Sequence, residues 1–287
     1  MWIADKWEDY KILDTSDGEK LEIWGRYSLV RPDPQVIWKS DKRNPLWKRA
    51  DAVDTRSKSG GGSWSGNRLP ESWNVKYRDL TFNVKPMGFK HTGLFPEQAA
   101  NWDWFRELIE GAGRPIRVLN LFAYTGGATV SAAKAGASVC HVDASKGMVQ
   151  AAKENARLSG LENAPIRYIV DDCRKFIERE IRRGNKYDGI IMDPPSYGRG
   201  PTGEVWKIEE AIDDFVALST GVLSDNPLFF LLNSYTTGLS ASTMKYIAHL
   251  RLLKKRSGAV EADELGLPVS DSGLALPCGS SVRVVFK

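Results

Sequence analysis

The sequence has few cysteines, no long apolar run and only a small excess of positive charge. Its 287 residues include three cysteines at distant positions, which form neither an even disulfide set nor a C-x-x-C metal pair. No apolar stretch approaches the roughly 18 residues of a membrane span, and the first residues lack the apolar segment of a secretory signal. We therefore expect no metal site, no membrane partner and a reducing, cytoplasmic location.

The charge balance says little about a partner. Forty Lys and Arg residues oppose 36 Asp and Glu residues, which gives a formal net charge of +4. Proteins that bind nucleic acid often carry a stronger basic stripe than this. The charge is thus compatible with an RNA partner but does not predict one. The overall mixture, 42% hydrophobic and 26% charged, excludes collagen, coiled coil and extensive disorder.

The first region, residues 1–84, holds seven of the ten tryptophans and reads as β-rich. Thr15-Ser-Asp-Gly predicts a hairpin between Tyr10-Lys-Ile-Leu and Leu21-Glu-Ile-Trp, and the Gly- and Ser-rich stretch 57–66 predicts a flexible loop. We interpret the tryptophans as the core of a small β-rich region, since each ring can bury roughly 150–250 Å². The alternative is a stacking platform for bases.

The second region, residues 85–287, reads as α/β. A further hairpin is expected over 81–95, and Pro96 predicts the first turn of a helix that extends to 111. From residue 117 onward, apolar runs typical of strands alternate with helical periodicity. We expect strands at 118–123, 138–142, 166–170, 187–192, 228–232 and 280–286, and helices near 129–135, 146–159, 173–183 and 207–223. This alternation predicts a doubly wound, mostly parallel sheet.

In such a sheet, ligands bind beyond the carboxyl ends of the strands, so the residues after each predicted strand form the candidate site. The first strand is followed by Phe122-Ala-Tyr-Thr-Gly-Gly, whose glycines would let the backbone approach a ligand and open the next helix. This turn is neither G-x-G-x-x-G nor a Walker loop, which argues against a pyrophosphate ligand and a NAD-binding oxidoreductase. Asp143 follows the second strand, and its carboxylate suits the two hydroxyls of a ribose.

The third and fourth strands also precede distinctive segments. Asp171-Asp-Cys follows the third and could read an adenine edge. Asp193-Pro-Pro-Ser-Tyr follows the fourth, and its prolines hold a rigid turn whose carbonyls and aromatic ring could grip a planar substrate group. Structural interpretations exist as well, since Asp143 could cap a helix and Pro194-Pro195 could simply end a strand. The order of the four motifs after four successive strands favours a functional site.

These segments carry a resemblance to a known family. Leu119-Asn-Leu-Phe-Ala-Tyr-Thr-Gly-Gly, Val142-Asp-Ala-Ser, Asp171-Asp-Cys and Asp193-Pro-Pro-Ser-Tyr resemble motifs I to IV of class I S-adenosylmethionine-dependent methyltransferases. Within that family the sequence is most similar to the bacterial large-subunit rRNA group that modifies cytosine C5 or guanine N7, which also has a segment similar to Lys90-His-Thr-Gly-Leu-Phe-Pro-Glu-Gln. The resemblance covers about residues 89–240, and it implies a Rossmann-like, seven-stranded methyltransferase sheet.

The resemblance also implies S-adenosylmethionine as the cofactor and a role for individual residues. The turn after the first strand would line the methionine moiety, Asp143 would bind the ribose, Ala144 and Ser145 would flank the adenine, and Asp172 would accept from its amino group. The expected cofactor-binding residues are Gln98, Phe122, Ala123, Tyr124, Thr125, Gly126, Asp143, Ala144, Ser145, Asp172 and Cys173. The expected catalytic residues, which would hold the acceptor near the methyl group, are Asp193, Pro194, Pro195 and Tyr197. Many class I enzymes have glycine where this sequence has Tyr124, so the carboxylate end of the cofactor would be bound in a variant way.

The positions of the cysteines bear on the chemistry. Methylation at C5 of a pyrimidine needs a thiolate that attacks C6, and this cysteine follows the fourth or fifth strand in the family. Here Ser196 and the segment Asn233-Ser-Tyr stand at those places, and we expect the latter to contact the substrate. Cys140, Cys173 and Cys278 lie elsewhere and are interpreted as small hydrophobic residues. The expected reaction is therefore direct methyl transfer to a nitrogen or oxygen.

The leading hypothesis is an RNA methyltransferase that acts on rRNA. One alternative is a methyltransferase of a small molecule or a protein. A cofactor-binding protein without catalysis is a second alternative, which the intact Asp193-Pro-Pro segment argues against. We interpret His91 and His141 as a loop and a strand histidine without a catalytic role.

Overall fold

The computed structural model describes residues 1–287 except 57–61, 67, 88–91, 200–204 and 237. The chain packs into two compact units. The first, here called the sheet unit, comprises Met1, Asn101–Glu264 and Gly279–Lys287, and the second, the β-rich unit, comprises Trp2–Ala100 and Leu265–Cys278. These limits differ from the expected division after Val84. Residues 265–278 pack in the β-rich unit because their backbone bonds to its strands: the amides of Ser270 and Asp271 donate to the carbonyls of Ile12 and Leu13 at 3.0 and 2.9 Å.

The large sheet has the expected doubly wound arrangement. Its strands are β9 (Arg117–Leu121), β10 (Ser138–Asp143), β11 (Ile166–Val170), β12 (Gly189–Met192), β15 (Phe229–Ser234), β16 (Gly258–Pro268), β17 (Ala275–Phe286) and the short β1 (Trp2–Ile3). The order along the sheet is β1-β16-β17-β15-β12-β9-β10-β11. The pairs from β15 to β11 are parallel, and β17 pairs antiparallel with β15. The described residues thus contain the expected seven strands, with β1 in addition.

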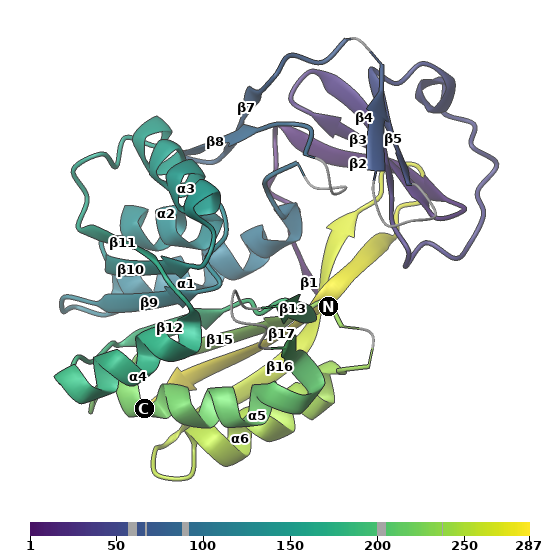
Figure 1. Ribbon diagram of the computed structural model, residues 1–287. Coiled ribbons are helices and arrows are strands. Elements are labelled where there is room, and N and C mark those ends of the chain that lie inside the picture. The colour runs from purple at the N-terminus through teal and green to yellow at the C-terminus, as the bar shows by residue number, and fades with distance from the viewer. Residues whose placement is uncertain (57–61, 67, 88–91, 200–204, 237) are drawn as a thin grey trace. The chain divides into compact units, whose positions relative to one another are not determined.

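Helices cover both faces of this sheet. On one face lie α1 (Ala99–Gly111), α2 (Gly127–Lys134) and α3 (Lys146–Leu158), and on the other α4 (Cys173–Arg183), α5 (Ile208–Ser219) and α6 (Ala241–Leu252) (Figure 1). The 3-10 helix η2 (Pro96–Gln98) leads into α1, as Pro96 predicts, and η3 (Thr220–Val222) follows α5. The hairpin β13 (Tyr197–Arg199) and β14 (Val205–Lys207) precedes α5. Neither this hairpin nor α6 was expected from the sequence.

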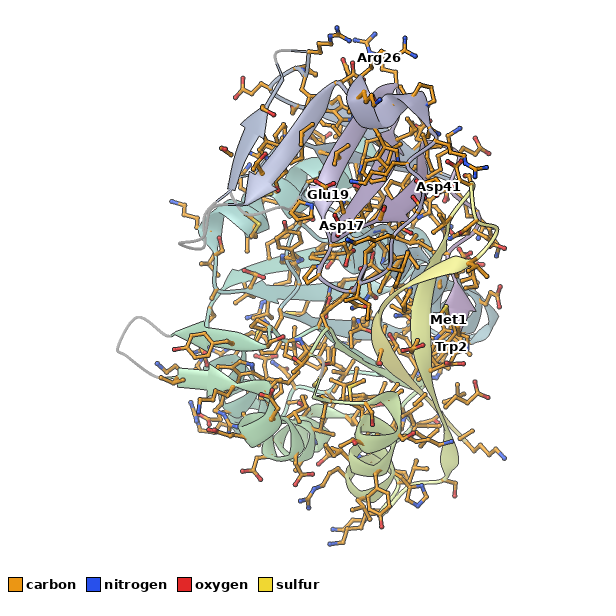
Figure 2. All side chains as sticks on the ribbon, turned by 90° about the vertical axis from the view of Figure 1, so that its right-hand side faces the viewer. Met1, Trp2, Asp17, Glu19, Arg26 and Asp41 are labelled. Carbon is orange, nitrogen blue, oxygen red and sulfur yellow. The ribbon has the colours of Figure 1, made fainter. Side chains whose placement is uncertain are left out.

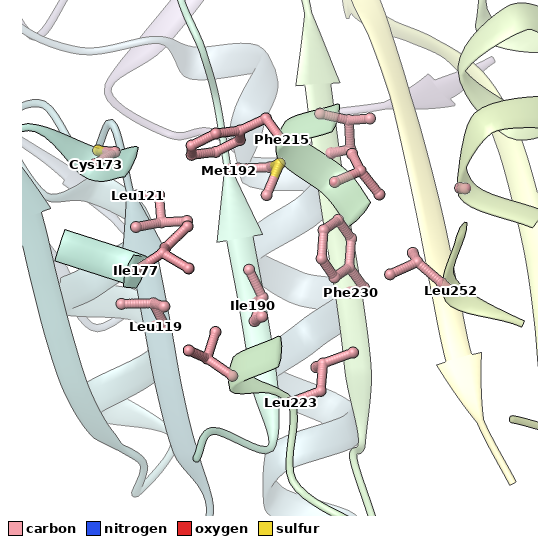
Figure 3. Close-up of a cluster of buried hydrophobic side chains, with 14 of the residues drawn as sticks. Leu119, Leu121, Cys173, Ile177, Ile190, Met192, Phe215, Leu223, Phe230 and Leu252 are labelled. Atoms are coloured by element: carbon pink, nitrogen blue, oxygen red, sulfur yellow. The ribbon is translucent and has the colours of Figure 1, made fainter. Parts of the chain in front are cut away.

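The main core lies between the sheet and helices α4, α5 and α6. Strands β12 and β15 are buried along their whole length, which explains their continuous apolar sequences. Figure 3 shows Leu119, Ile190 and Phe230 projecting from neighbouring strands into one cluster with Phe215 and Leu252. Burial of each such side chain contributes roughly 1.5–3 kcal/mol, so this cluster fixes the strands that end at the site.

The β-rich unit contains a five-stranded sheet of β2 (Tyr10–Ser16), β3 (Glu19–Trp24), β4 (Tyr27–Pro32), β5 (Ala52–Arg56) and β6 (Gly62–Ser65). The predicted hairpin is confirmed: Asp17 and Gly18 form a two-residue turn with positive φ of 53° and 79°. Asp17 and Glu19 mark one end of these strands and Arg26 marks the other (Figure 2). A 3-10 helix, η1 (Pro45–Lys48), precedes β5.

One local expectation for this unit was wrong, and another falls partly outside the described residues. The stretch 57–66 is not a loop throughout, because Gly62–Ser65 form β6 and pair with β5; residues 57–61 lie outside the described residues. The strand β8 (Leu80–Val84) pairs antiparallel with β7 (Trp73–Tyr77). Of the hairpin expected over 81–95, residues 88–91 lie outside the described residues, and the Lys85 amide donates to the carbonyl of Thr92 at 3.1 Å.

Most tryptophans of the β-rich unit are buried or half-buried, whereas Trp38 is 40% exposed. Trp24 is fully buried. The indole N–H of Trp47 donates to Asp14 Oδ2 at 2.8 Å, and those of Trp7 and Trp64 donate to backbone carbonyls at 2.9 Å. These contacts support the structural interpretation for Trp24, Trp47, Trp7 and Trp64; the stacking alternative stays a prediction.

Candidate active site

The carboxyl ends of the strands lie at one level. Leu121 pairs with Val142 on one side and with Met192 on the other, so the residues that follow β9, β10 and β12 meet at one edge of the sheet. Strand β9 lies between β10 and β12, where the order of the strands reverses direction. Such a switch point is the place where open α/β sheets bind ligands. The predicted motifs therefore gather where the sequence indicated.

Residues 122–126, here called the cofactor turn, adopt an unusual backbone. Phe122 and Tyr124 have positive φ of 54° and 49°, and Gly126 has 81°. The left-handed region is unfavourable for residues with a Cβ, and it persists only where the surroundings hold it. The amide of Ala123 donates to the carbonyl of Val142 at 3.1 Å, which ties the turn to the next strand. Strained backbone of this kind is concentrated at functional sites.

Asp143 fixes the cofactor turn from the end of β10. Its Oδ2 accepts from the Tyr124 amide and its Oδ1 from the Ser145 amide, each at 2.8 Å. Burial raises the pKa of this carboxyl above its usual value, and the two amide bonds oppose that effect. Each carboxylate oxygen has two lone pairs, so each can accept a further bond. This acceptor set fits the two hydroxyls of a ribose.

Asp143 is not the cap of the following helix. Ser145 takes that position, and its Oγ accepts from the Met148 amide at 3.4 Å. Ala144 and Ser145 are exposed at the edge of the sheet, where the predicted contact with an adenine remains a prediction.

The paired glycines of the turn serve helix packing. A Cβ on Gly126 would lie 2.7 Å from the Cβ of Ala152 in α3, and one on Gly127 would lie 2.7 Å from Cζ2 of Trp102 in α1. Real Cβ atoms do not approach so closely, so the glycines allow α3 and α1 to pack against the start of α2. Gly126 does open α2, as expected, and α3 and α1 fill the side on which a Cβ of these glycines would lie. The expected approach of their backbone to a ligand remains a prediction.

Several polar residues that were not expected from the sequence form buried hydrogen bonds, either to the cofactor turn or between the strands and the helix that flank it. Asn155 Nδ2 donates to the carbonyl of Thr125 at 2.9 Å. Asn120 Nδ2 donates to Thr129 Oγ1 at 2.9 Å, and this hydroxyl lies 2.9 Å from Nδ1 of His141. Burial lowers the pKa of His141 to about 4, so the ring is neutral near pH 7. The available signal was polar side chains inside otherwise apolar strands and helices.

The segment after β11 is partly structural. Asp172 caps α4, with its Oδ1 accepting from the Lys175 amide at 2.9 Å. Cys173 is buried, and its Sγ accepts from the Phe122 amide at 3.3 Å. Burial raises the pKa of this thiol, which keeps it protonated. Any contact of Cys173 with an adenine would therefore be made by its backbone.

Residues 193–197, here called the acceptor loop, follow β12 and are held from two sides. The Trp206 indole N–H donates to the carbonyl of Pro195 at 2.6 Å, and Thr236 Oγ1 donates to Ser196 Oγ at 2.6 Å. The Asp193 amide donates to the carbonyl of Leu121 at 3.4 Å, which places the start of this loop beside the cofactor turn. Tyr197 is 52% exposed.

The expectation that Asn233 contacts the substrate was wrong. Asn233 is buried, and its Oδ1 accepts from Asn101 Nδ2 at 3.1 Å and from Ser281 Oγ at 2.6 Å. Arg283 Nε completes the network by donating to Asn101 Oδ1 at 2.9 Å. The side chain of Asn233 faces α1 and β17 because it lies on the inner side of the pleat. Ser234 is buried too.

The remaining predicted residues belong to the β-rich unit or lie outside the described residues. Gln98 is buried in η2 of the β-rich unit, and its expected contact with the cofactor remains a prediction. His91 lies outside the described residues. Among the residues that the structure describes, no helix is both long and apolar enough to cross a membrane. In this same part of the chain, no three His, Cys, Asp or Glu side chains are grouped so that they could hold a metal ion.

Comparisons with known proteins agree with this geometry. Residues 19–208 match the family described as S-adenosylmethionine-dependent methyltransferase. The chain is similar to a crystal structure of an S-adenosylmethionine-dependent methyltransferase from Agrobacterium tumefaciens, with 38% identity, a TM-score of 0.91, and coverage of 96% of this chain and 90% of that one.

Curated relatives match a smaller part of the chain. A ribosomal RNA large subunit methyltransferase K/L from Shewanella frigidimarina is 34% identical over 147 residues, which are 50% of this chain and 20% of that protein. A ribosomal RNA large subunit methyltransferase I from an Enterobacter species is 31% identical over 157 residues, which are 53% of this chain and 38% of that protein. The chain thus spans well under half the length of these relatives.

Proposed function

Since the chain belongs to the S-adenosylmethionine-dependent methyltransferase family, we propose that it transfers the cofactor's methyl group to ribosomal RNA. The observation that carries this proposal is the pairing of Asp143 and the cofactor turn with an Asp193-Pro-Pro acceptor loop at one switch point. The names of the curated relatives support RNA as the acceptor. We expect the enzyme to act in the cytoplasm, where ribosomes are assembled.

The cofactor fits the polar groups of the site. When bound, S-adenosylmethionine supplies an activated methyl group on a sulfonium centre. We assign the ribose hydroxyls to Asp143, the methionine moiety to residues 122–126, and the adenine to Ala144, Ser145, Asp172 and the backbone of Cys173. In these assignments the protein contributes orientation and exclusion of water rather than a covalent step.

The acceptor loop would hold the nucleophile. The Asp193 carboxylate and the Pro194 carbonyl would accept a hydrogen bond from an attacking amine, while the carbonyl of Pro195 accepts from Trp206. Such a bond orients the nitrogen lone pair toward the methyl group. Tyr197, half-exposed in the same loop, would pack against the planar group that carries the amine.

The cysteines favour direct transfer over a covalent intermediate. Cys140 and Cys173 are buried, and burial raises the pKa of Cys140 to about 11. Burial likewise raises the pKa of Cys278, which belongs to the β-rich unit. A nucleophilic cysteine needs an accessible thiolate, and these environments oppose one.

Replacement of all three cysteines by Ala or Ser should leave most of the turnover, and a 5-fluoropyrimidine substrate should trap no protein adduct. An adduct that disappears with one cysteine variant would return the protein to the cytosine-C5 group.

The acceptor is tested by mass spectrometry of rRNA nucleosides. We expect a deletion strain to lack one methylated nucleoside, which the wild-type gene restores and the Asp193→Ala gene does not. Unchanged rRNA in the deletion strain would contradict the proposal and favour the small-molecule or protein acceptor instead.

A further inference from the structure

Trp206 connects the two loops at the switch point of the sheet. It is half-buried in β14, opposite Gly198 of β13. Its indole N–H donates to the carbonyl of Pro195 in the acceptor loop at 2.6 Å. The centroid of its ring lies 5.6 Å from that of Phe122 in the cofactor turn. A single side chain therefore contacts both loops.

Phe215 anchors this arrangement in the core. Its ring centroid lies 5.5 Å from those of both Phe122 and Trp206, and its contact with Trp206 is edge-to-face at 84°. Phe215 itself is fully buried in α5, and Figure 3 shows it beside Met192, the last residue of β12. The three rings of Phe122, Trp206 and Phe215 thus form a triangle in which each contacts the other two. Because Phe215 is fixed in the core, it holds the other two rings in place.

The triangle also explains how Phe122 keeps its left-handed backbone. A phenylalanine with φ of 54° is strained, and its conformation persists because the surroundings determine it. Trp206 and Phe215 pack against its ring, while Cys173 Sγ accepts from its amide at 3.3 Å. Loss of the Trp206 ring would remove one of these three supports.

We propose that Trp206 is a positioning residue for methyl transfer, whose indole N–H fixes the acceptor loop while its ring supports the cofactor turn. The neighbouring Ser196 has other supports, since its carbonyl accepts from the Ile208 amide at 3.1 Å and its hydroxyl accepts from Thr236. The Pro195 carbonyl, in contrast, depends on Trp206. This inference rests on methyl transfer at this site but not on the identity of the acceptor.

Two variants separate the two roles of Trp206. Trp206→Phe keeps an aromatic ring beside Phe122 and removes the donor to Pro195. We expect hydrogen exchange at the Asp193 and Ser196 amides to accelerate, kcat to fall by about tenfold, and the Kd for S-adenosylmethionine to stay within about threefold of wild type. Trp206→Ala removes the ring as well, so its Kd should rise by roughly tenfold or more. Val205→Ala, an exposed neighbour on the same strand, is the control and should match wild type.

Exchange and calorimetry decide the question without any acceptor. The inference is overturned if Trp206→Phe leaves exchange in the acceptor loop at the wild-type rate. It is also overturned if Trp206→Phe weakens cofactor binding and protection throughout the sheet unit as much as Trp206→Ala does, because that result indicates a merely structural role. If wild type methylates no RNA, the proposed acceptor fails, while the exchange and affinity data still test Trp206.

Discussion

Asp143 has two tasks at the residue scale, since it holds the cofactor turn and is assigned to the ribose. Its carboxylate accepts from the amides of Tyr124 and Ser145 and retains lone pairs for two hydroxyls. We predict that Asp143→Ala weakens S-adenosylmethionine binding by about 2–4 kcal/mol, because both hydroxyls lose a charged acceptor. Calorimetry on the purified variant measures this loss, and an affinity within threefold of wild type would refute the assignment.

Asp172 tests a second cofactor assignment, the one to the adenine. It is also a carboxylate at the edge of the sheet, but its Oδ1 already caps α4. Asp172→Ala should lower the melting temperature because the cap is lost. Because the adenine is also assigned to Asp172, this variant should weaken S-adenosylmethionine binding as well, which calorimetry measures. An unchanged affinity would show that capping α4 is its whole role.

The buried ring of His141 leads to a prediction about how the stability of the protein depends on pH. Burial lowers the pKa of its ring to about 4, below the roughly 6.5 of an unfolded histidine. Between pH 6.5 and pH 4, the unfolded chain therefore binds a proton at this histidine that the folded protein does not. The free energy of unfolding is unaffected by this difference above about pH 6.5, and it decreases as the pH falls toward 4. Between pH 7 and pH 4.5, wild type should lose about 2–3 kcal/mol more stability than His141→Asn does. Urea unfolding at both pH values checks this, and equal losses would contradict it.

The residues of the site were predictable where they follow a strand and not where they bond across the fold. Asp143 and Asp193 stand at the ends of apolar runs, so their place at the edge of the sheet could be inferred. Asn155 bonds to Thr125 of the turn, 30 positions away, and Asn120 bonds to Thr129 of α2, 9 positions away. A polar residue in an apolar element signals that it has a partner but does not identify that partner. Asn233 was misjudged because the sequence does not tell which face of the pleat a strand-end residue occupies.

At the scale of elements, helices and strands with strong periodicity were found in the sequence almost to the residue. The helix at 173–183 and the strand at 166–170 agree with α4 and β11. Helix α6 was missed because Tyr246 and Leu250 are exposed, 71% and 51%, and blur its apolar stripe of Met244, Ala248 and Leu252. Strand β16 was missed because its first seven residues, of which three are acidic, include no buried one.

The close packing of α3 against the start of α2 leads to a further prediction about stability. Gly126→Ala would place a Cβ 2.7 Å from the Cβ of Ala152 at a φ of 81°. We expect the variant to lose about 2–4 kcal/mol of stability, from the clash and from the left-handed backbone together. The second change Ala152→Gly should restore the part that is due to the clash, which a double-mutant cycle in urea measures. Additive effects of the two changes would show that the contact does not limit this position.

At the scale of the whole molecule, the acceptor is the property that the sequence determines least. The chain has a net charge of only +4, and it spans 20% and 38% of the two rRNA methyltransferases described above. If RNA is the acceptor, its binding should weaken with salt, because contacts to phosphates release counterions. Filter binding of rRNA fragments between low and physiological salt measures this slope. A flat slope would favour a small molecule or a protein.

Methyl transfer in vitro tests the central claim most directly. Purified enzyme is incubated with S-adenosylmethionine labelled in its methyl group and with rRNA from the deletion strain, and the label in RNA is counted. We predict transfer by wild type, and a rate for Asp193→Ala that is lower by roughly 10²-fold with cofactor affinity retained. Label that enters protein or small molecules and not rRNA, or an Asp193→Ala variant as fast as wild type, would contradict it.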